Sequence, residues 1–191
     1  MLKVASFDIV FQEIPGEVTL ALNLSNCPCH CPGCHSPHLA EDIGEEMTES
    51  LMNGLLDRYG SMITCVCFMG GDQAPEEVAQ WAEYIKDLSV KRSVSASGPS
   101  SVNPKDGLKT AWYSGRPHLP ECLSTNDSER SVSETVCPLS GVAGPFDYIK
   151  LGPYIESLGG LKSPTTNQRL YKRVGDCWTD ITATFWRSNF E

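Results

Sequence analysis

Four cysteines stand within eight residues of one another: Cys27, Cys29, Cys31 and Cys34. Thiolate sulfur is the ligand that binds zinc and the irons of iron–sulfur clusters. Pro28, Pro32 and Gly33 stand between the cysteines, and these residue types allow the chain to turn back on itself. The four thiols can therefore converge, and the run predicts a compact metal centre.

The type of metal is open on spacing alone. A zinc site usually combines two pairs of ligands separated by a dozen residues or more, and Cys65 and Cys67 could supply a second pair. A disulfide within so short a loop would strain the required Cα separation of about 4.4–6.8 Å. The four thiols are spaced more closely than in that zinc pattern, so the run favours an iron–sulfur cluster, and a zinc site is the alternative. The same two cysteines are read more simply as small core residues on one face of a strand.

A second feature is Gly70-Gly71-Asp72, which follows the apolar run 63–69. Glycines let a backbone approach a ligand closely and accept positive φ without steric cost. On its own the run would be a turn. It directly follows an expected strand, however, and α/β sheets build their sites at the carboxyl ends of strands. We therefore expect a ligand site here.

Other polar residues allow two interpretations each. Lys150 ends an expected strand and either contacts a bound carboxylate or lies at the surface. Asn167, with the two polar residues after it, either recognises a cofactor or caps the last strand. Three histidines near the cysteines could tune the metal or be solvated loop residues: His30, His35 and His38.

The periodicity of apolar residues predicts the elements that position these groups. Thr48 can cap a helix in which Leu51, Leu55, Leu56 and Tyr59 share one face, and Pro75 suits the first turn of a second helix. Strands are expected at 18–24, 63–69, 109–113, 147–151 and 169–174. The alternation of strand and helix predicts an α/β fold with a parallel sheet.

The chain length of 191 residues predicts one domain, 1–191, too short for a full eight-stranded barrel of roughly 250 residues. Two segments rich in Ser, Pro, Gly and Asn are predicted as flexible insertions, 89–107 and 117–145. A variable tail is expected at 175–191.

Composition narrows the partners and the compartment. The net charge of -9 argues against nucleic acid and anionic membrane as partners. No apolar run approaches the roughly 20 residues of a membrane span. Nine cysteines without an export signal favour a reducing compartment, so we expect a cytoplasmic protein.

The spacing of Cys27, Cys31 and Cys34 resembles the C-x3-C-x2-C motif of the radical S-adenosylmethionine superfamily. The resemblance implies that these three cysteines hold a [4Fe–4S] cluster, while Cys29 is the spare thiol. The fourth iron would then be open to S-adenosylmethionine. Gly70-Gly71-Asp72 resembles the superfamily's Gly-Gly-Glu motif, with Asp in place of Glu. The implied fold is a partial (βα) barrel, open on one side.

Finer similarity narrows the family to the activating enzyme of anaerobic (class III) ribonucleoside-triphosphate reductase. It rests on the runs 31–35, 111–116, 146–154 and 166–171, and it extends over residues 7–88 and 109–174. The resemblance implies an activase that cleaves S-adenosylmethionine reductively and generates a glycyl radical on the reductase, with a flavodoxin-type reductant. The implied cofactor-binding residues are Gly70, Gly71, Asp72, Ser114, Lys150 and Asn167.

Three rival functions are compatible with the sequence. An activase of another glycyl-radical enzyme, such as pyruvate formate-lyase, would share the mechanism. A radical enzyme acting on a small molecule would need no protein partner. A non-catalytic zinc-binding module would contain zinc without iron and sulfide.

Overall fold

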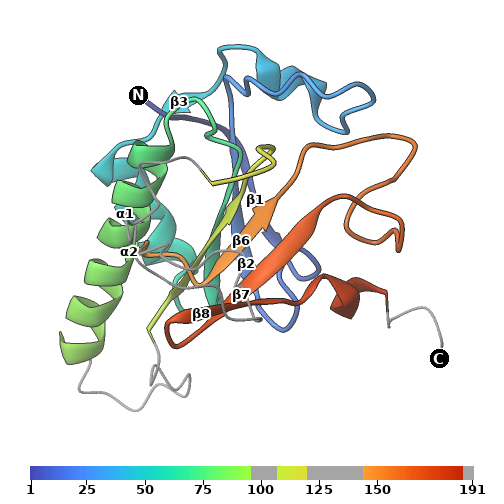
Figure 1. Ribbon diagram of the computed structural model, residues 1–191. Helices are drawn as coiled ribbons and strands as arrows, with labels where there is room; N and C mark the ends of the chain where they lie inside the picture. Colours follow the sequence, from blue (N-terminus) through green and yellow to red (C-terminus); the bar gives the residue numbers. More distant parts are fainter. Residues whose placement is uncertain (96–106, 120–143, 187–191) are drawn as a thin grey trace, which may run out of the picture.

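An eight-stranded mixed β-sheet runs through residues 1–95, 107–119 and 144–186, which this computed structural model describes (Figure 1). The strand order is β3-β1-β2-β4-β5-β6-β7-β8. The strands are β1 (Lys3–Val10), β2 (Thr19–Leu24), β3 (Glu45–Glu46), β4 (Cys65–Met69), β5 (Lys109–Tyr113), β6 (Tyr148–Leu151), β7 (Arg169–Val174) and β8 (Cys177–Asp180).

The centre of the sheet is parallel and its margins are antiparallel. Strands β2, β4, β5 and β6 run in the same direction, in the register Leu22↔Phe68↔Trp112↔Ile149. Strands β1 and β7 pair antiparallel with the two outer members of this set. All four parallel strands therefore end at the same edge of the sheet, and the loops that follow them lie close together.

Two α-helices cover one face of the sheet (Figure 1). Helix α1 (Glu49–Tyr59) is capped by Thr48, whose hydroxyl accepts a hydrogen bond from the backbone N–H of Leu51, so the predicted cap is confirmed. Helix α2 (Pro75–Ser95) begins at Pro75, as predicted. Short 3-10 helices follow the cysteine run (η1, Pro37–Ala40) and end the described chain (η3, Thr182–Phe185).

The sheet is apolar on both faces. On the helical side the buried cluster includes Leu22, Phe68 and Trp112. Because side chains alternate along a strand, the neighbouring residues point the other way, where Cys67 and Ala111 pack in a second cluster. A parallel sheet buried on both faces explains why β2 and β4 are nearly continuous apolar runs.

All five predicted strands are present, and the described residues contain three more, the shortest of them the two-residue β3. Strand β1 precedes the first predicted strand, and β8 lies inside the segment expected as a variable tail. Residues 89–95 of the first expected insertion belong to α2, which continues to Ser95. The rest of both insertions, 96–106 and 120–143, lies outside the described residues, as do residues 187–191.

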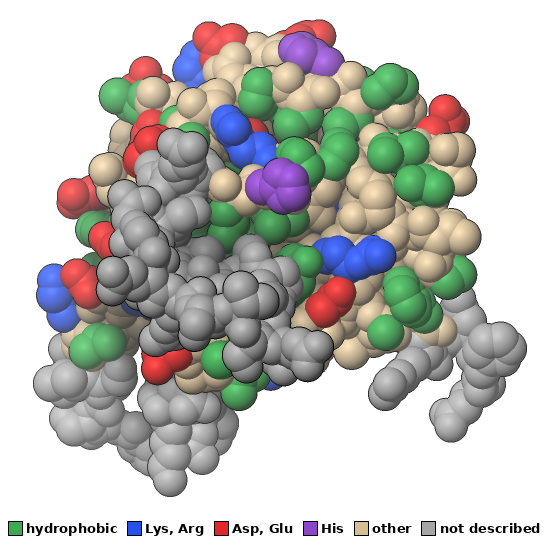
Figure 2. All heavy atoms as spheres, in the orientation of Figure 1, with side chains coloured by type: hydrophobic (Ala, Val, Ile, Leu, Met, Phe, Trp, Pro, Cys, Tyr) green, Lys and Arg blue, Asp and Glu red, His purple; other side chains and the backbone are tan. Residues whose placement is uncertain are grey.

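Across the described ranges the sheet does not close on itself, since β3 and β8 form its two edges. The predicted partial barrel and its family assignment stay predictions. Within the same ranges no helix has the length and apolar character needed to cross a membrane. Figure 2 shows acidic and basic side chains interspersed over the described part of one face, rather than a basic patch.

Candidate metal and ligand site

A cavity of about 590 Å³ opens at the carboxyl ends of the parallel strands. Its walls come from the loops after β2, β4, β5 and β6 and from the end of β6 itself, and Gln12 and Glu13 of the loop after β1 also line it. Apolar side chains contribute to its lining, among them Leu24, Met69 and Leu161. The polar and thiol groups that line it include Cys27, Cys29, Cys31, Cys34, Asp72, Ser114 and Lys150.

The cysteine loop curls because three of its residues adopt left-handed backbone conformations: Asn26 (φ 59), His30 (φ 42) and Gly33 (φ 73). Asparagine, histidine and glycine tolerate this conformation better than most residues do. The start of the loop is held by η1, where the N–H of Cys27 donates to the carbonyl of Leu39 at 2.9 Å. The curl turns all four half-buried thiols toward one cavity.

Two of the sulfurs have specific neighbours. The backbone N–H of Ser36 donates to Cys34 Sγ at 3.4 Å, a contact of the kind that stabilises thiolate ligands of iron–sulfur clusters. Cys29 Sγ donates to Asp72 Oδ2 at 3.9 Å. Burial, followed by the charge of Asp72, raises the pKa of the Cys29 thiol to about 12.

The two glycines of the loop after β4 have different roles. Gly70 (φ 101) lines the cavity. Gly71 (φ 84) does not, and a Cβ placed there would stand 2.6 Å from Val78 Cγ2 and 2.8 Å from Leu24 Cδ1. Gly71 is therefore needed for the close approach of this loop to α2 and β2, while its predicted contact with a cofactor stays untested.

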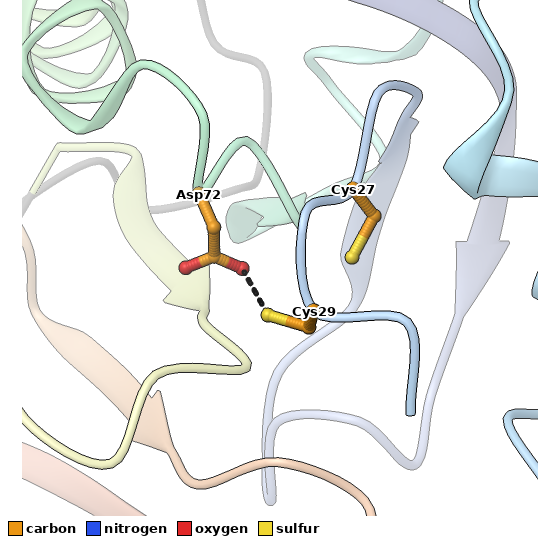
Figure 3. A group of neighbouring side chains, drawn as sticks. All are labelled: Cys27, Cys29 and Asp72. Carbon is orange, nitrogen blue, oxygen red and sulfur yellow. Dashed lines mark hydrogen bonds between the residues drawn. The ribbon is translucent and has the colours of Figure 1, made fainter. Parts of the chain in front are cut away.

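Asp72 is the most buried acidic side chain of the site, with 1% of its surface exposed. Its Oδ1 accepts from Ser114 Oγ at 2.5 Å and its Oδ2 from the N–H of Gly115 at 3.0 Å. The guanidinium of Arg116 donates to the Asp72 carbonyl and lies 3.8 Å from Oδ1. Asp72 thus ties the loop after β4 to the loop after β5, and it faces the cysteine loop (Figure 3).

Lys150 brings a positive charge to the cavity from the end of β6. Its Nζ donates to the carbonyls of Gly152 at 2.7 Å and Ser114 at 3.3 Å. Burial lowers its pKa to about 8, although the nearby Asp72 opposes the shift. The two hydrogen bonds to backbone carbonyls fix the ammonium group beside the thiols and the carboxylate.

Asn167 and Gln168 lie where β7 begins. Asn167 Nδ2 donates to the carbonyl of Pro153 at 2.9 Å and is not part of the cavity wall, so it braces the loop after β6. Gln168 does line the cavity and is 7% exposed. Gln168 therefore occupies the position in the cavity wall that was predicted for Asn167.

Of the other cysteines and histidines considered above, some lie in the core, one lines the cavity and two lie away from it. Cys65 and Cys67 are fully buried between β2 and β5, which confirms their interpretation as core residues. His35 lines the cavity, and its ring centroid lies 5.0 Å from that of Tyr154. His30 and His38 are exposed and do not line it.

Cys29, Gly115 and Arg116 are the site residues that sequence reasoning undervalued. A Cβ at Gly115 would stand 2.5 Å from Cys29 Sγ, so the glycine makes room for this thiol. A signal was present, because Ser114-Gly115-Arg116 directly follow the strand that neighbours β4. Loops after adjacent parallel strands meet at one edge, so their contact with Gly70-Gly71-Asp72 could have been predicted.

Comparison with known proteins gives no match: no family model fits the chain, and no curated protein or solved structure is significantly similar to it. The geometry must therefore be interpreted by its chemistry. Four thiols, a buried carboxylate and a buried ammonium group surround one cavity. This donor set can bind a thiophilic metal centre together with a small ligand that carries charge.

Proposed function

We propose that the protein is a radical S-adenosylmethionine enzyme that generates a glycyl radical on anaerobic ribonucleoside-triphosphate reductase. The observation that carries the proposal is the convergence of the cysteine loop, Gly70, Asp72 and Lys150 on one cavity. These groups come from different strands, and the parallel arrangement of β2, β4 and β6 brings them together.

The donor chemistry fits the cofactors that the cysteine motif implies. Cys27, Cys31 and Cys34 offer three thiolates, which leaves one iron of a [4Fe–4S] cluster without a protein ligand. The volume of about 590 Å³ falls within the range of roughly 300–1,000 Å³ typical of small-molecule pockets. When bound, the cluster and S-adenosylmethionine supply the one-electron chemistry that removes a hydrogen atom from a glycine Cα of the reductase.

The chain's own residues bind and orient these groups. The Lys150 ammonium, held by two backbone carbonyls, offers a positive charge to the carboxylate of the methionine moiety. Gly70 leaves its part of the wall without a side chain, so a ligand can approach the backbone there. Leu24, Met69 and Leu161 line the cavity with apolar surface, which disfavours water.

The test is the formation of a glycyl radical. Protein reconstituted with iron and sulfide without oxygen, reduced and mixed with S-adenosylmethionine and a cognate class III reductase should give a doublet electron paramagnetic resonance signal. Cys31→Ala should abolish it, while Cys177→Ala, at an exposed free cysteine on β8, should not.

The partner and the radical position are tested in the same experiment. The signal should vanish when the radical-site glycine of the reductase is replaced by alanine. Formation of the radical only on a pyruvate formate-lyase would refute the assignment of the partner. Absence of any radical from a loaded, reduced protein on either partner would refute the activase function.

A further inference from the structure

Cys27, Cys29 and Asp72 form a group that the proposed cluster does not use as a unit (Figure 3). One potential ligand atom of each, two sulfurs and a carboxylate oxygen, lies within 4.8 Å of the other two. The set shares Cys27 with the proposed cluster ligands but replaces Cys31 and Cys34. It joins the loops after β2 and β4 across the cavity.

The carboxylate of this group is already oriented as a metal ligand would be. Asp72 is 1% exposed, and its two oxygens accept hydrogen bonds from Ser114 Oγ and the N–H of Gly115. Carboxylates that bind metals are usually held by such donors, which fix their direction. Each carboxylate oxygen has two lone pairs, so Oδ2 can accept from the N–H of Gly115 with one and direct the other toward Cys29.

The geometry is close to that of a zinc site. Three atoms separated by 4.8 Å or less surround a centre that lies no more than about 2.8 Å from each of them. Zinc binds sulfur at about 2.3 Å and carboxylate oxygen at about 2.0–2.2 Å, so each ligand need move by only about 0.5–0.8 Å. Both cysteines are half-buried on a loop, where side-chain rotation allows such a shift.

We propose that the protein without its cluster binds one Zn²⁺ ion through Cys27 Sγ, Cys29 Sγ and the Asp72 carboxylate, with water from the cavity as the fourth ligand. Two thiolates favour Zn²⁺ over the oxygen-seeking Mg²⁺ and Ca²⁺. Zinc and the cluster exclude each other, because both require Cys27. This inference goes beyond the proposed function and does not depend on it.

The experiment uses Co²⁺ as a coloured probe for the zinc position in the full, reduced, iron-free protein under anaerobic conditions. We expect one equivalent of Co²⁺ to give the visible and near-ultraviolet absorption of a tetrahedral site with thiolate ligands, and Zn²⁺ to bleach it. Cys29→Ala should weaken Co²⁺ binding at least tenfold. Ser114→Ala, which removes a donor to Asp72, should weaken it by about 10- to 100-fold.

The matched variants are Cys31→Ala and Cys34→Ala, which should bind Co²⁺ as the unchanged protein does while failing to assemble a cluster. Cys29→Ala should behave in the opposite way, with weak Co²⁺ binding and normal cluster assembly. Equal Co²⁺ affinity in Cys29→Ala and the unchanged protein, or loss of binding in Cys31→Ala, would overturn the zinc site. Failure of the unchanged protein to assemble a cluster would count against the proposed function alone.

Discussion

Replacing Asp72 by alanine should destabilise the fold strongly. Its carboxylate accepts hydrogen bonds from Ser114 Oγ and the N–H of Gly115, and it lies 3.8 Å from the guanidinium of Arg116. Only 1% of the side chain is exposed, so its two hydrogen bonds are largely shielded from solvent in the folded protein. The substitution therefore leaves donors of the loop after β5 without partners.

The size of the loss follows from these contacts. A buried donor left without an acceptor costs about 1–3 kcal/mol, and two are affected. The Arg116 side chain is 41% exposed, so solvent reduces its share to the small value typical of surface ion pairs. We expect a loss of about 2–6 kcal/mol in the free energy of unfolding, or roughly 4–24 °C in Tm for a chain of this size.

Urea unfolding followed by circular dichroism measures the loss. Asp42 is the matched control, because its carboxylate lies only 2.7 Å from Lys3 Nζ but is 60% exposed. Asp42→Ala should leave the midpoint unchanged, since exposed ion pairs contribute little. Equal midpoints for Asp72→Ala and the unchanged protein would refute the buried clamp, as would equal losses for both variants.

Other predictions concern the glycine loop and the amino ends of the strands. Gly71→Ala should lower the free energy of unfolding by about 2–4 kcal/mol, because it combines positive φ with a Cβ 2.6 Å from Val78 Cγ2. Gly54 lies in open space on α1, so Gly54→Ala should instead raise the free energy of unfolding by about 0.5–1 kcal/mol. Burial alone would raise the pKa of Glu17, but hydrogen bonds from Lys109, Thr64 and Tyr148 outweigh it and lower the pKa. This carboxylate therefore contributes stability above its ordinary pKa of 4.5 that is lost as the pH falls through its lower folded value. Urea midpoints of Glu17→Gln and the unchanged protein should differ at pH 7 and approach each other in acid, and a difference independent of pH would contradict this.

Much of the central fold could be predicted because its signals are local. Strand β5 has the predicted bounds, Lys109–Tyr113, and β4 is an apolar run with a clear end at a glycine. Helix α1 carries both its cap and its apolar stripe in the sequence. Such elements are recognisable without knowledge of their neighbours.

The missed strands depend on their partners. Three consecutive residues of β1, from Ser6 to Asp8, are exposed, so its sequence lacks a continuous apolar run. Strand β8 does have a local signal, because Gly175-Asp176 forms a two-residue connection from Val174 to Cys177. Glycine in the left-handed region is typical of such hairpins. A hairpin signal therefore lies within the segment predicted as a variable tail.

In the site, too, some features follow from local sequence signals and others depend on the folded chain. Four cysteines in one loop predict a metal centre from spacing alone. That Cys29 rather than Cys31 faces Asp72 follows from the loop's left-handed residues and from the space left by Gly115, which are properties of the folded chain. Gln168, and not the predicted Asn167, lines the cavity. Which of these neighbouring side chains points inward depends on the orientation of the chain just before β7, which is also a property of the folded chain.

The central claim, a cluster that cleaves S-adenosylmethionine in this cavity, is tested most directly by anaerobic reconstitution followed by product analysis. We expect iron and sulfide in equal amounts, and release of 5′-deoxyadenosine when the reduced protein is mixed with S-adenosylmethionine. Both should be lost in Cys31→Ala and kept in Cys177→Ala. Zinc without iron and sulfide in the reconstituted protein, or a loaded and reduced protein that releases no 5′-deoxyadenosine, would contradict it.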